Sequence, residues 1–197
     1  MVRTVWACLG MWLFSASSPA AAIAPHNRLA VWPSKLPTPD FALRDETGAH
    51  RSVQDYRGHI LLVFFGFIQC PDACPIELLK LSQVMRRLGP LGDRVRLVFI
   101  TLDPKHDTPA ELKTYLANFD PRFIGLTGSV AEVDAAAKRF AVNYAPIAKG
   151  AGYTIDHSTA TFVLDAGGAL RLVGGKESTT EDFVHDLKIL TSKQDPR

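Results

Sequence analysis

The chain carries, from residue 60 to residue 75, the sequence ILLVFFGFIQCPDACP. Its first eight residues, 60–67, are apolar without alternation, a pattern that predicts a central strand buried on both faces. Cys70 and Cys74 follow this strand, and they are the only cysteines beyond the extreme N-terminus. Pro75 suits the first position of a helix. The stretch therefore predicts a buried strand, a turn that holds two thiols, and a helix.

The position of the two thiols predicts their chemistry. A residue before proline disfavours helical dihedral angles, so Cys74 is expected just outside the helix, beside its positive end. That position lowers the pKa of a thiol and favours the thiolate, which binds metal ions and exchanges disulfides. A disulfide that closes so short a loop would remove little chain entropy. A reactive role is therefore favoured over a structural one.

Alternating strands and helices follow the dithiol. The predicted elements are a helix to about residue 88 with Leu79 in its apolar stripe, a strand over 95–102, a helix from Pro109, a strand over 123–126, a helix over 130–142, a hairpin over 160–173, and a helix from the capping box Ser178–Glu181 to about residue 190. Before the dithiol, residues 41–43 and 51–53 predict an N-terminal hairpin. This order predicts an α/β, thioredoxin-like fold with a central mixed sheet flanked by helices.

The N-terminal residues differ from the rest of the chain. Residues 1–22 combine a basic start, an apolar stretch and three consecutive alanines, the three parts of a secretory signal. An uncleaved membrane anchor is the alternative, although the apolar stretch is shorter than the about 20 residues that span a bilayer. Residues 23–39 contain four prolines and predict a tether, and residues 40–193 predict the thioredoxin-like domain. We expect export, to the bacterial periplasm.

Charge and composition narrow the class of partner. The 197 residues carry a formal net charge of +2, and 47% of them are hydrophobic. No long run has one sign of charge. These values are ordinary for a globular protein and give no reason to expect a nucleic-acid partner.

Candidate metal ligands meet at one predicted edge of the sheet. Ligands of open α/β sheets bind at the carboxyl ends of the strands, where the dithiol turn, the turn at Asp103 and a loop over 153–158 converge. That loop contains His157. A lone histidine is more often a surface or capping residue, but its place opposite Cys70 and Cys74 favours a ligand. Two thiolates and one imidazole form a soft set suited to Cu(I).

A zinc ion is the alternative occupant of the same edge. A structural zinc site usually takes four ligands, and only three strong candidates are present. An aspartate oxygen, from Asp72, Asp103 or Asp156, would supply a fourth ligand or a supporting contact. The remaining histidines lie on predicted loops or on a polar helix face, and we expect them to be solvated: His26, His50, His59, His106 and His185.

Several motifs, taken in order, resemble one protein family. Phe65-Gly66-Phe67 leads to Cys70-Pro71-Asp72-Ala73-Cys74-Pro75, and residues 102–109, residues 119–128 and Asp156-His157-Ser158 follow. Together these motifs resemble the Sco/SenC proteins over residues 37–190. The resemblance implies a thioredoxin-like copper-binding protein that helps to assemble the binuclear copper centre of cytochrome c oxidase. It also implies that Cys70, Cys74 and His157 are the copper ligands.

The resemblance favours a copper metallochaperone, a binding protein and not an enzyme, that carries Cu(I) or Cu(II). Its implied partners are the copper-accepting subunit of cytochrome c oxidase, a thioredoxin-like reductase and an upstream copper donor. The alternative is an exported thiol-disulfide oxidoreductase that reduces the cysteines of a copper-site protein or another target. Against it, three residues separate Cys70 from Cys74, whereas dedicated oxidoreductases of this fold have two. A thiol peroxidase is disfavoured because its motif, Pro-x-x-x-Thr-x-x-Cys, does not precede Cys70.

Overall fold

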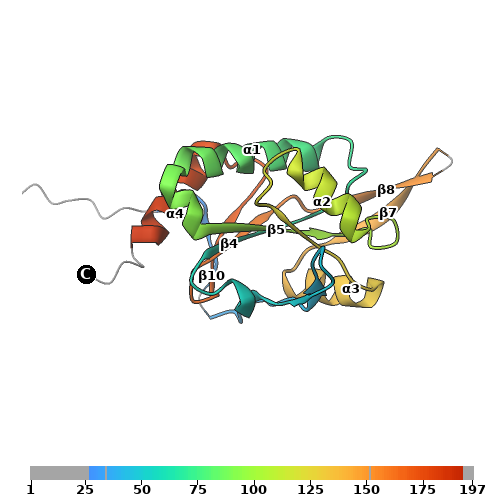
Figure 1. Ribbon diagram of the computed structural model, residues 1–197, viewed down its shortest axis with the longest axis horizontal. Helices are drawn as coiled ribbons and strands as arrows, with labels where there is room; N and C mark the ends of the chain where they lie inside the picture. The colour runs from blue at the N-terminus through green and yellow to red at the C-terminus, as the bar shows by residue number, and fades with distance from the viewer. Residues whose placement is uncertain (1–26, 34, 151, 193–197) are drawn as a thin grey trace, which may run out of the picture.

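A six-stranded mixed sheet lies at the centre of the computed structural model, which describes residues 27–33, 35–150 and 152–192 (Figure 1). The signal predicted for residues 1–22 lies outside the described residues. The strand order across the sheet is β1-β10-β9-β4-β5-β6. Strands β4, β5 and β6 run parallel, and the other three extend the sheet in antiparallel fashion. The strands are β1 (Ala30–Val31), β4 (Ile60–Gly66), β5 (Val95–Thr101), β6 (Ile124–Leu126), β9 (Thr161–Leu164) and β10 (Leu170–Gly174). The predicted mixed sheet is confirmed.

Strand β4 occupies the middle of the sheet because its residues are all apolar. It pairs with β5 in parallel from Ile60 opposite Val95 to Gly66 opposite Thr101, and with β9 on its other side. All seven of its residues are buried. A strand covered on both faces needs no polar alternation, which explains the unbroken apolar run. Its carboxyl end delivers the chain to the dithiol turn.

Helices cover both faces of the sheet (Figure 1). Helices α1 (Ala73–Leu88), α2 (Pro109–Ala117) and α4 (Thr180–Ser192) lie on one side, and α3 (Val130–Arg139) lies on the other. Short 3-10 helices complete the chain at η1 (Val53–Tyr56) and η2 (Gly89–Arg94). The described part of the chain contains no helix with the length and apolar composition needed to cross a membrane.

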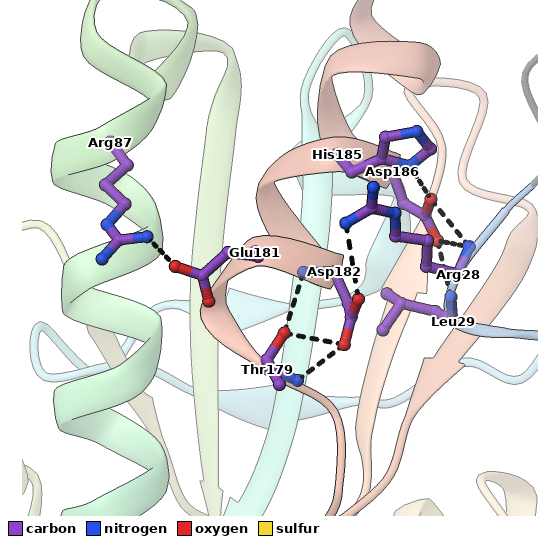
Figure 2. A network of polar contacts seen from close by, with 8 residues as sticks. All are labelled: Arg28, Leu29, Arg87, Thr179, Glu181, Asp182, His185 and Asp186. Carbon is purple, nitrogen blue, oxygen red and sulfur yellow. Dashed lines mark hydrogen bonds and ion pairs between the residues drawn. The ribbon is translucent and has the colours of Figure 1, made fainter.

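Capping residues set where the helices begin. Thr108 and Glu111 form the predicted capping box of α2, and Ser129 and Glu132 form that of α3. Helix α3 ends at Arg139, earlier than predicted. The box of α4 is formed by Thr179 and Asp182, one residue later than predicted (Figure 2). Both boxes fit the same Ser/Thr-x-x-acid pattern, so the sequence alone does not choose between them.

The core has an aromatic group on each side of the sheet. On the α3 side, Phe65 and Phe162 both contact Phe140, with ring centroids 5.4 Å and 5.1 Å away. On the α1 side, Phe64 and Phe99 are 6.0 Å apart in an edge-to-face arrangement. The apolar stripe of α1 is buried as predicted except for Leu79, which is 51% exposed. Ile76, three residues earlier and not part of the predicted stripe, is 61% exposed.

Two hairpins form two-stranded sheets of their own. The predicted N-terminal hairpin is present as β2 (Leu43–Arg44) and β3 (His50–Arg51). A second hairpin, β7 (Tyr144–Lys149) and β8 (Gly152–His157), projects beyond the end of the sheet (Figure 1). The loop predicted over 153–158 is strand β8 up to His157, so this prediction is wrong. Strand β7 is exposed over nearly its whole length, so it lacks the apolar pattern by which strands are recognised.

A buried carboxylate fixes the described start of the chain. Asp186 of α4 is fully buried and accepts hydrogen bonds from the backbone N–H groups of Arg28 and Leu29 (Figure 2). His185 also contacts it at 2.8 Å, so this histidine is not simply solvated as predicted. Strand β1 follows directly and pairs with β10. Part of the segment that the sequence analysis assigned to a tether is therefore an ordered edge of the sheet.

Candidate metal centre

The three predicted ligands meet at the carboxyl end of β4. Cys70 lies in the turn after β4, Cys74 lies in the first turn of α1, and His157 is the last residue of β8. The two sulfur atoms and a ring nitrogen all lie within 4.8 Å of one another. Within the described residues this is the one group of three or more Cys, His, Asp and Glu side chains arranged to hold a metal ion. Residues separated by more than 80 positions in the sequence thus form one site.

Cys74 is the second residue of α1, so the prediction that Pro75 opens the helix is wrong. The first four N–H groups of a helix have no partner within it, so Pro75 at the third position loses no hydrogen bond. Cys74 itself is completely buried. Burial raises the pKa of its thiol, with a further contribution from the neighbouring Cys70, contrary to the lowered value that we predicted. Desolvation of the thiolate outweighs the helix dipole here.

Cys70 is the more accessible of the two thiols. The residue is partly exposed, and its sulfur accepts a hydrogen bond from the backbone N–H of Cys74 at 3.3 Å. An amide from the first turn of α1 thus points at Cys70, whereas the helix end was predicted to act on Cys74. Both cysteines are free thiols in the structure. An incoming ion or a partner thiol would reach Cys70 first.

His157 is oriented as a ligand. Its Nδ1–H donates to the carbonyl oxygen of Ser158 at 3.1 Å, which leaves Nε2 unprotonated. Nε2 lies 3.6 Å from Sγ of Cys74. Phe67 packs edge-to-face against the ring at 6.0 Å, and burial lowers the pKa of His157. A neutral imidazole with its free nitrogen aimed at the dithiol is the form that binds metal ions.

Gly66 permits the close packing of Cys74, and the sequence analysis gave it no role in the site. A Cβ atom at Gly66 would lie 2.7 Å from Sγ of Cys74 and 2.8 Å from Cε2 of Phe99. Both distances are far below an ordinary contact. A glycine inside a buried strand often marks such a close approach. The position of Gly66 at the end of the apolar run therefore indicates from the sequence alone that another group packs against it.

Substituting Gly66 by alanine is expected to displace Sγ of Cys74 and weaken Cu(I) binding by about tenfold or more, because overpacking forces neighbouring groups off their positions. A competition titration against a Cu(I) chelator measures the effect. Gly175→Ala is the matched control, since a Cβ atom there would meet no atom within 4 Å. Equal affinities of the Gly66→Ala variant and the control would show that the packing at Gly66 does not position Cys74.

No aspartate joins the ligand group in the described structure. Asp72, Asp103 and Asp156 are absent from the set of converging ligand atoms, so the suggested fourth oxygen is not found. The carboxylate of Asp103 instead accepts hydrogen bonds from the hydroxyl of Tyr153, 2.8 Å from each oxygen, and contacts Nδ1 of His106 at 3.0 Å. His106 therefore contacts Asp103, and the prediction that it is simply solvated is wrong.

Asp107 hydrogen-bonds to the segment just before the dithiol turn, a contact that was not predicted. Its buried carboxylate accepts hydrogen bonds from the backbone N–H of Ile68 at 3.1 Å and from the hydroxyl of Thr101 at 2.6 Å. Burial raises the pKa of Asp107. The contact joins the loop after β5 to the segment just before Cys70.

Helix α1 is joined to β9, the strand after His157, by a buried hydrogen bond to Glu77. Glu77, one turn after Cys74, accepts a hydrogen bond from the hydroxyl of Thr161 at 2.8 Å. Lys80 pairs with Glu77 at 2.6 Å and donates to the carbonyl oxygen of Ser178 at 2.9 Å. The polar groups satisfy one another, as buried charges require. They hold the helix that carries Cys74 against the strand that follows His157.

The donor set determines which ions fit. Two sulfur atoms and one imidazole nitrogen suit a soft ion, and Cu(I) accepts so few ligands, whereas a closed zinc site would need a fourth. The site is compact, with one thiol buried and one partly exposed. Its donor set fits a copper ion.

Known proteins share both the sequence and the fold. The family model SCO1/SenC matches residues 33–192. The mitochondrial protein SCO2 homolog of Mus musculus is 39% identical over 153 residues, which are 76% of this chain and 60% of the mouse protein. The structure of Bradyrhizobium japonicum ScoI with copper bound matches at 34% identity and a TM-score of 0.72, covering 79% of this chain and 99% of that one.

A further structure is that of BsSco, a member of the Sco family of cytochrome c oxidase assembly proteins in which a disulfide switch was identified. It matches at 25% identity and a TM-score of 0.62, covering 79% of this chain and 93% of that one. Its fold and that of ScoI confirm the thioredoxin-like Sco architecture. With the family model covering most of its length, the chain belongs to the SCO1/SenC family.

Proposed function

We propose that the protein binds one copper ion through Cys70, Cys74 and His157 and delivers it to the binuclear copper centre of cytochrome c oxidase. One observation carries the proposal. Nε2 of His157, freed by the hydrogen bond of Nδ1 to Ser158, lies 3.6 Å from Sγ of Cys74 in a group whose ligand atoms all lie within 4.8 Å. Copper is the cargo of this site, which supplies three ligands and partial access to solvent.

Two relatives support the link to copper and to cytochrome c oxidase assembly. ScoI of Bradyrhizobium japonicum was solved with copper bound, and BsSco belongs to a family of oxidase assembly proteins. The chain spans 60% of the length of the mouse relative. We propose three partners for this chain. They are an upstream copper donor, a thioredoxin-like reductase and the copper-accepting oxidase subunit.

The relatives include a mitochondrial protein and a bacterial one. We propose that residues 1–22 direct export of this chain to a periplasm, and that the thioredoxin-like domain predicted over 40–193 also includes strand β1.

Substituting His157 by alanine tests the ligand set. Cu(I) affinity is expected to fall by about tenfold or less, because the two thiolates dominate binding of the softer ion. Cu(II) affinity is expected to fall by about 100-fold or more, because imidazole matters more to the harder ion. Competition titrations with chelators of each ion measure both. His50→Ala, at an exposed position in β3, is the control. Unchanged affinity for both ions would remove His157 from the site.

A thiol-disulfide oxidoreductase is the second candidate function, favoured by the unequal exposure of the two thiols. The thiolate of Cys70 would attack a disulfide of the target and form a mixed disulfide, releasing one target thiolate. Cys74, after losing its proton, would displace the second target sulfur and close a Cys70–Cys74 disulfide. The target gains two electrons and becomes a dithiol, while this protein becomes oxidised. Stoichiometric reduction of a model disulfide peptide, one disulfide per reduced protein with no other reductant present, separates this function from copper delivery.

A further inference from the structure

The hairpin of β7 and β8 places His157 over the dithiol, and one face of β8 rests on the domain. Alternate residues of a strand point to the same side, so Tyr153, Ile155 and His157 share a face. Each of them has a partner in the domain. Ile155 is buried, His157 lies against Cys74, and the hydroxyl of Tyr153 meets Asp103.

The contact of Tyr153 is a compact polar cluster. Its hydroxyl lies 2.8 Å from both oxygens of Asp103 and 2.7 Å from Nδ1 of His106. The two rings pack with centroids 5.7 Å apart. Asp103 is 8% exposed, whereas Tyr153 is 43% exposed. The tyrosine is therefore held chiefly by its hydroxyl group and by this ring contact, not by burial in the core.

The cluster links the hairpin that carries His157 to the turn that carries Cys70. Asp103 lies in the loop after β5, whose Asp107 accepts a hydrogen bond from the backbone N–H of Ile68, close to Cys70. The hairpin and the turn therefore both hydrogen-bond to the loop after β5. The base of the hairpin has an anchor of its own, since Tyr144 of β7 hydrogen-bonds to Asp134 of α3.

We propose that Tyr153 is a positioning residue whose hydroxyl latches the hairpin onto Asp103 and thereby holds His157 over the dithiol. An isolated two-stranded hairpin is at best marginally stable, so this projecting one needs contacts with the domain to stay in one position. Without the latch, the hairpin populates arrangements in which His157 lies away from Cys74. Apparent affinity falls by the fraction of molecules in which the ligand is in place. The expected change in copper affinity rests on the proposed function, whereas the expected change in the NMR signals of the metal-free protein does not.

Tyr153→Phe removes the hydroxyl and keeps the ring that packs on His106. The first measurement uses the metal-free, reduced full-length protein and follows the ring signals of His157 by NMR relaxation dispersion. We expect exchange broadening of these signals in the variant and none in the wild type. Tyr56→Phe is the control, because the buried hydroxyl of Tyr56 has no hydrogen-bond partner in the described structure. Identical His157 signals in Tyr153→Phe and wild type would overturn the latch.

The second measurement compares the two copper ions. Tyr153→Phe is expected to lower Cu(II) affinity about tenfold, because a hydrogen bond to a charged group is lost, and to change Cu(I) affinity about twofold at most. Equal losses for both ions would indicate general disruption and overturn the positioning role. In an Asp103→Asn background the tyrosine substitution should have a smaller effect, since both changes act on one contact. Full additivity would overturn the link through Asp103.

Failure of the proposed function gives a different result. If wild-type protein binds neither ion, copper carriage is wrong, while the metal-free NMR comparison still decides whether Tyr153 holds His157. If the wild type binds copper and the Tyr153→Phe variant matches it in both measurements, the latch alone is wrong.

Discussion

Replacing either Cys70 or Cys74 with alanine is expected to abolish tight Cu(I) binding. The site offers only two thiolates and one imidazole, and a single thiolate with one imidazole is a poor set for a soft ion. Loss of a supporting partner of a metal ligand typically costs 10- to 100-fold in affinity, so loss of a ligand should cost more than about 100-fold. A competition titration of the reduced variants against a Cu(I) chelator measures it.

The two cysteine variants need different controls because the residues differ in burial. Cys74 packs completely inside the core, so its removal also leaves a small cavity that lowers stability. Cys70 is partly exposed, and its removal should change the melting temperature little. Equal loss of copper by both variants, with unequal loss of stability, is the expected pattern. Wild-type affinity in either variant would refute the proposed ligand set.

Oxidation of the dithiol is expected to block copper loading completely. Cys70 and Cys74 cannot form a disulfide and act as two thiolate ligands at the same time, because metal binding needs the reduced, deprotonated sulfur. Both thiols are free in the structure, and their sulfurs lie within the 4.8 Å group. In an oxidising compartment the protein would depend on a reducing partner before each loading.

The test is to oxidise the protein, remove the oxidant and offer Cu(I) with and without a dithiol reductant. Peptide mass mapping confirms that the disulfide joins Cys70 and Cys74. Loading to one copper per chain should appear only after reduction. Full loading of protein that still carries this disulfide would exclude the dithiol as the copper site.

The sequence predicted most of the fold because its elements carry strong local signals. The apolar run of β4, the capping boxes of α2 and α3, and the Asp-Ala-Gly-Gly turn between β9 and β10 each specify structure within a few residues. The ligand group was also predicted, since the strand-to-helix turn brings the cysteines to the sheet edge that the segment with His157 also reaches.

The features that escaped prediction depend on contacts between distant segments. Strand β7 is exposed and pairs only with β8, so no apolar pattern announces it. The raised pKa of Cys74 follows from complete burial beside Gly66, which the helix-dipole argument did not include. The contacts of Asp107 and Tyr153 also join distant segments. Asp107, in the loop after β5, accepts a hydrogen bond from Ile68 before the dithiol turn, and Tyr153 of the hairpin hydrogen-bonds to Asp103 of the same loop.

X-ray absorption at the copper edge, on reduced protein loaded with one Cu(I), tests the central claim most directly. Wild-type protein should show two sulfur neighbours and one nitrogen neighbour around copper, in keeping with the convergence of Cys70, Cys74 and His157. The His157→Ala variant should retain both sulfur neighbours and lose the nitrogen. A wild-type site with fewer than two sulfur neighbours, or a nitrogen neighbour that persists unchanged in the variant, would contradict the assignment.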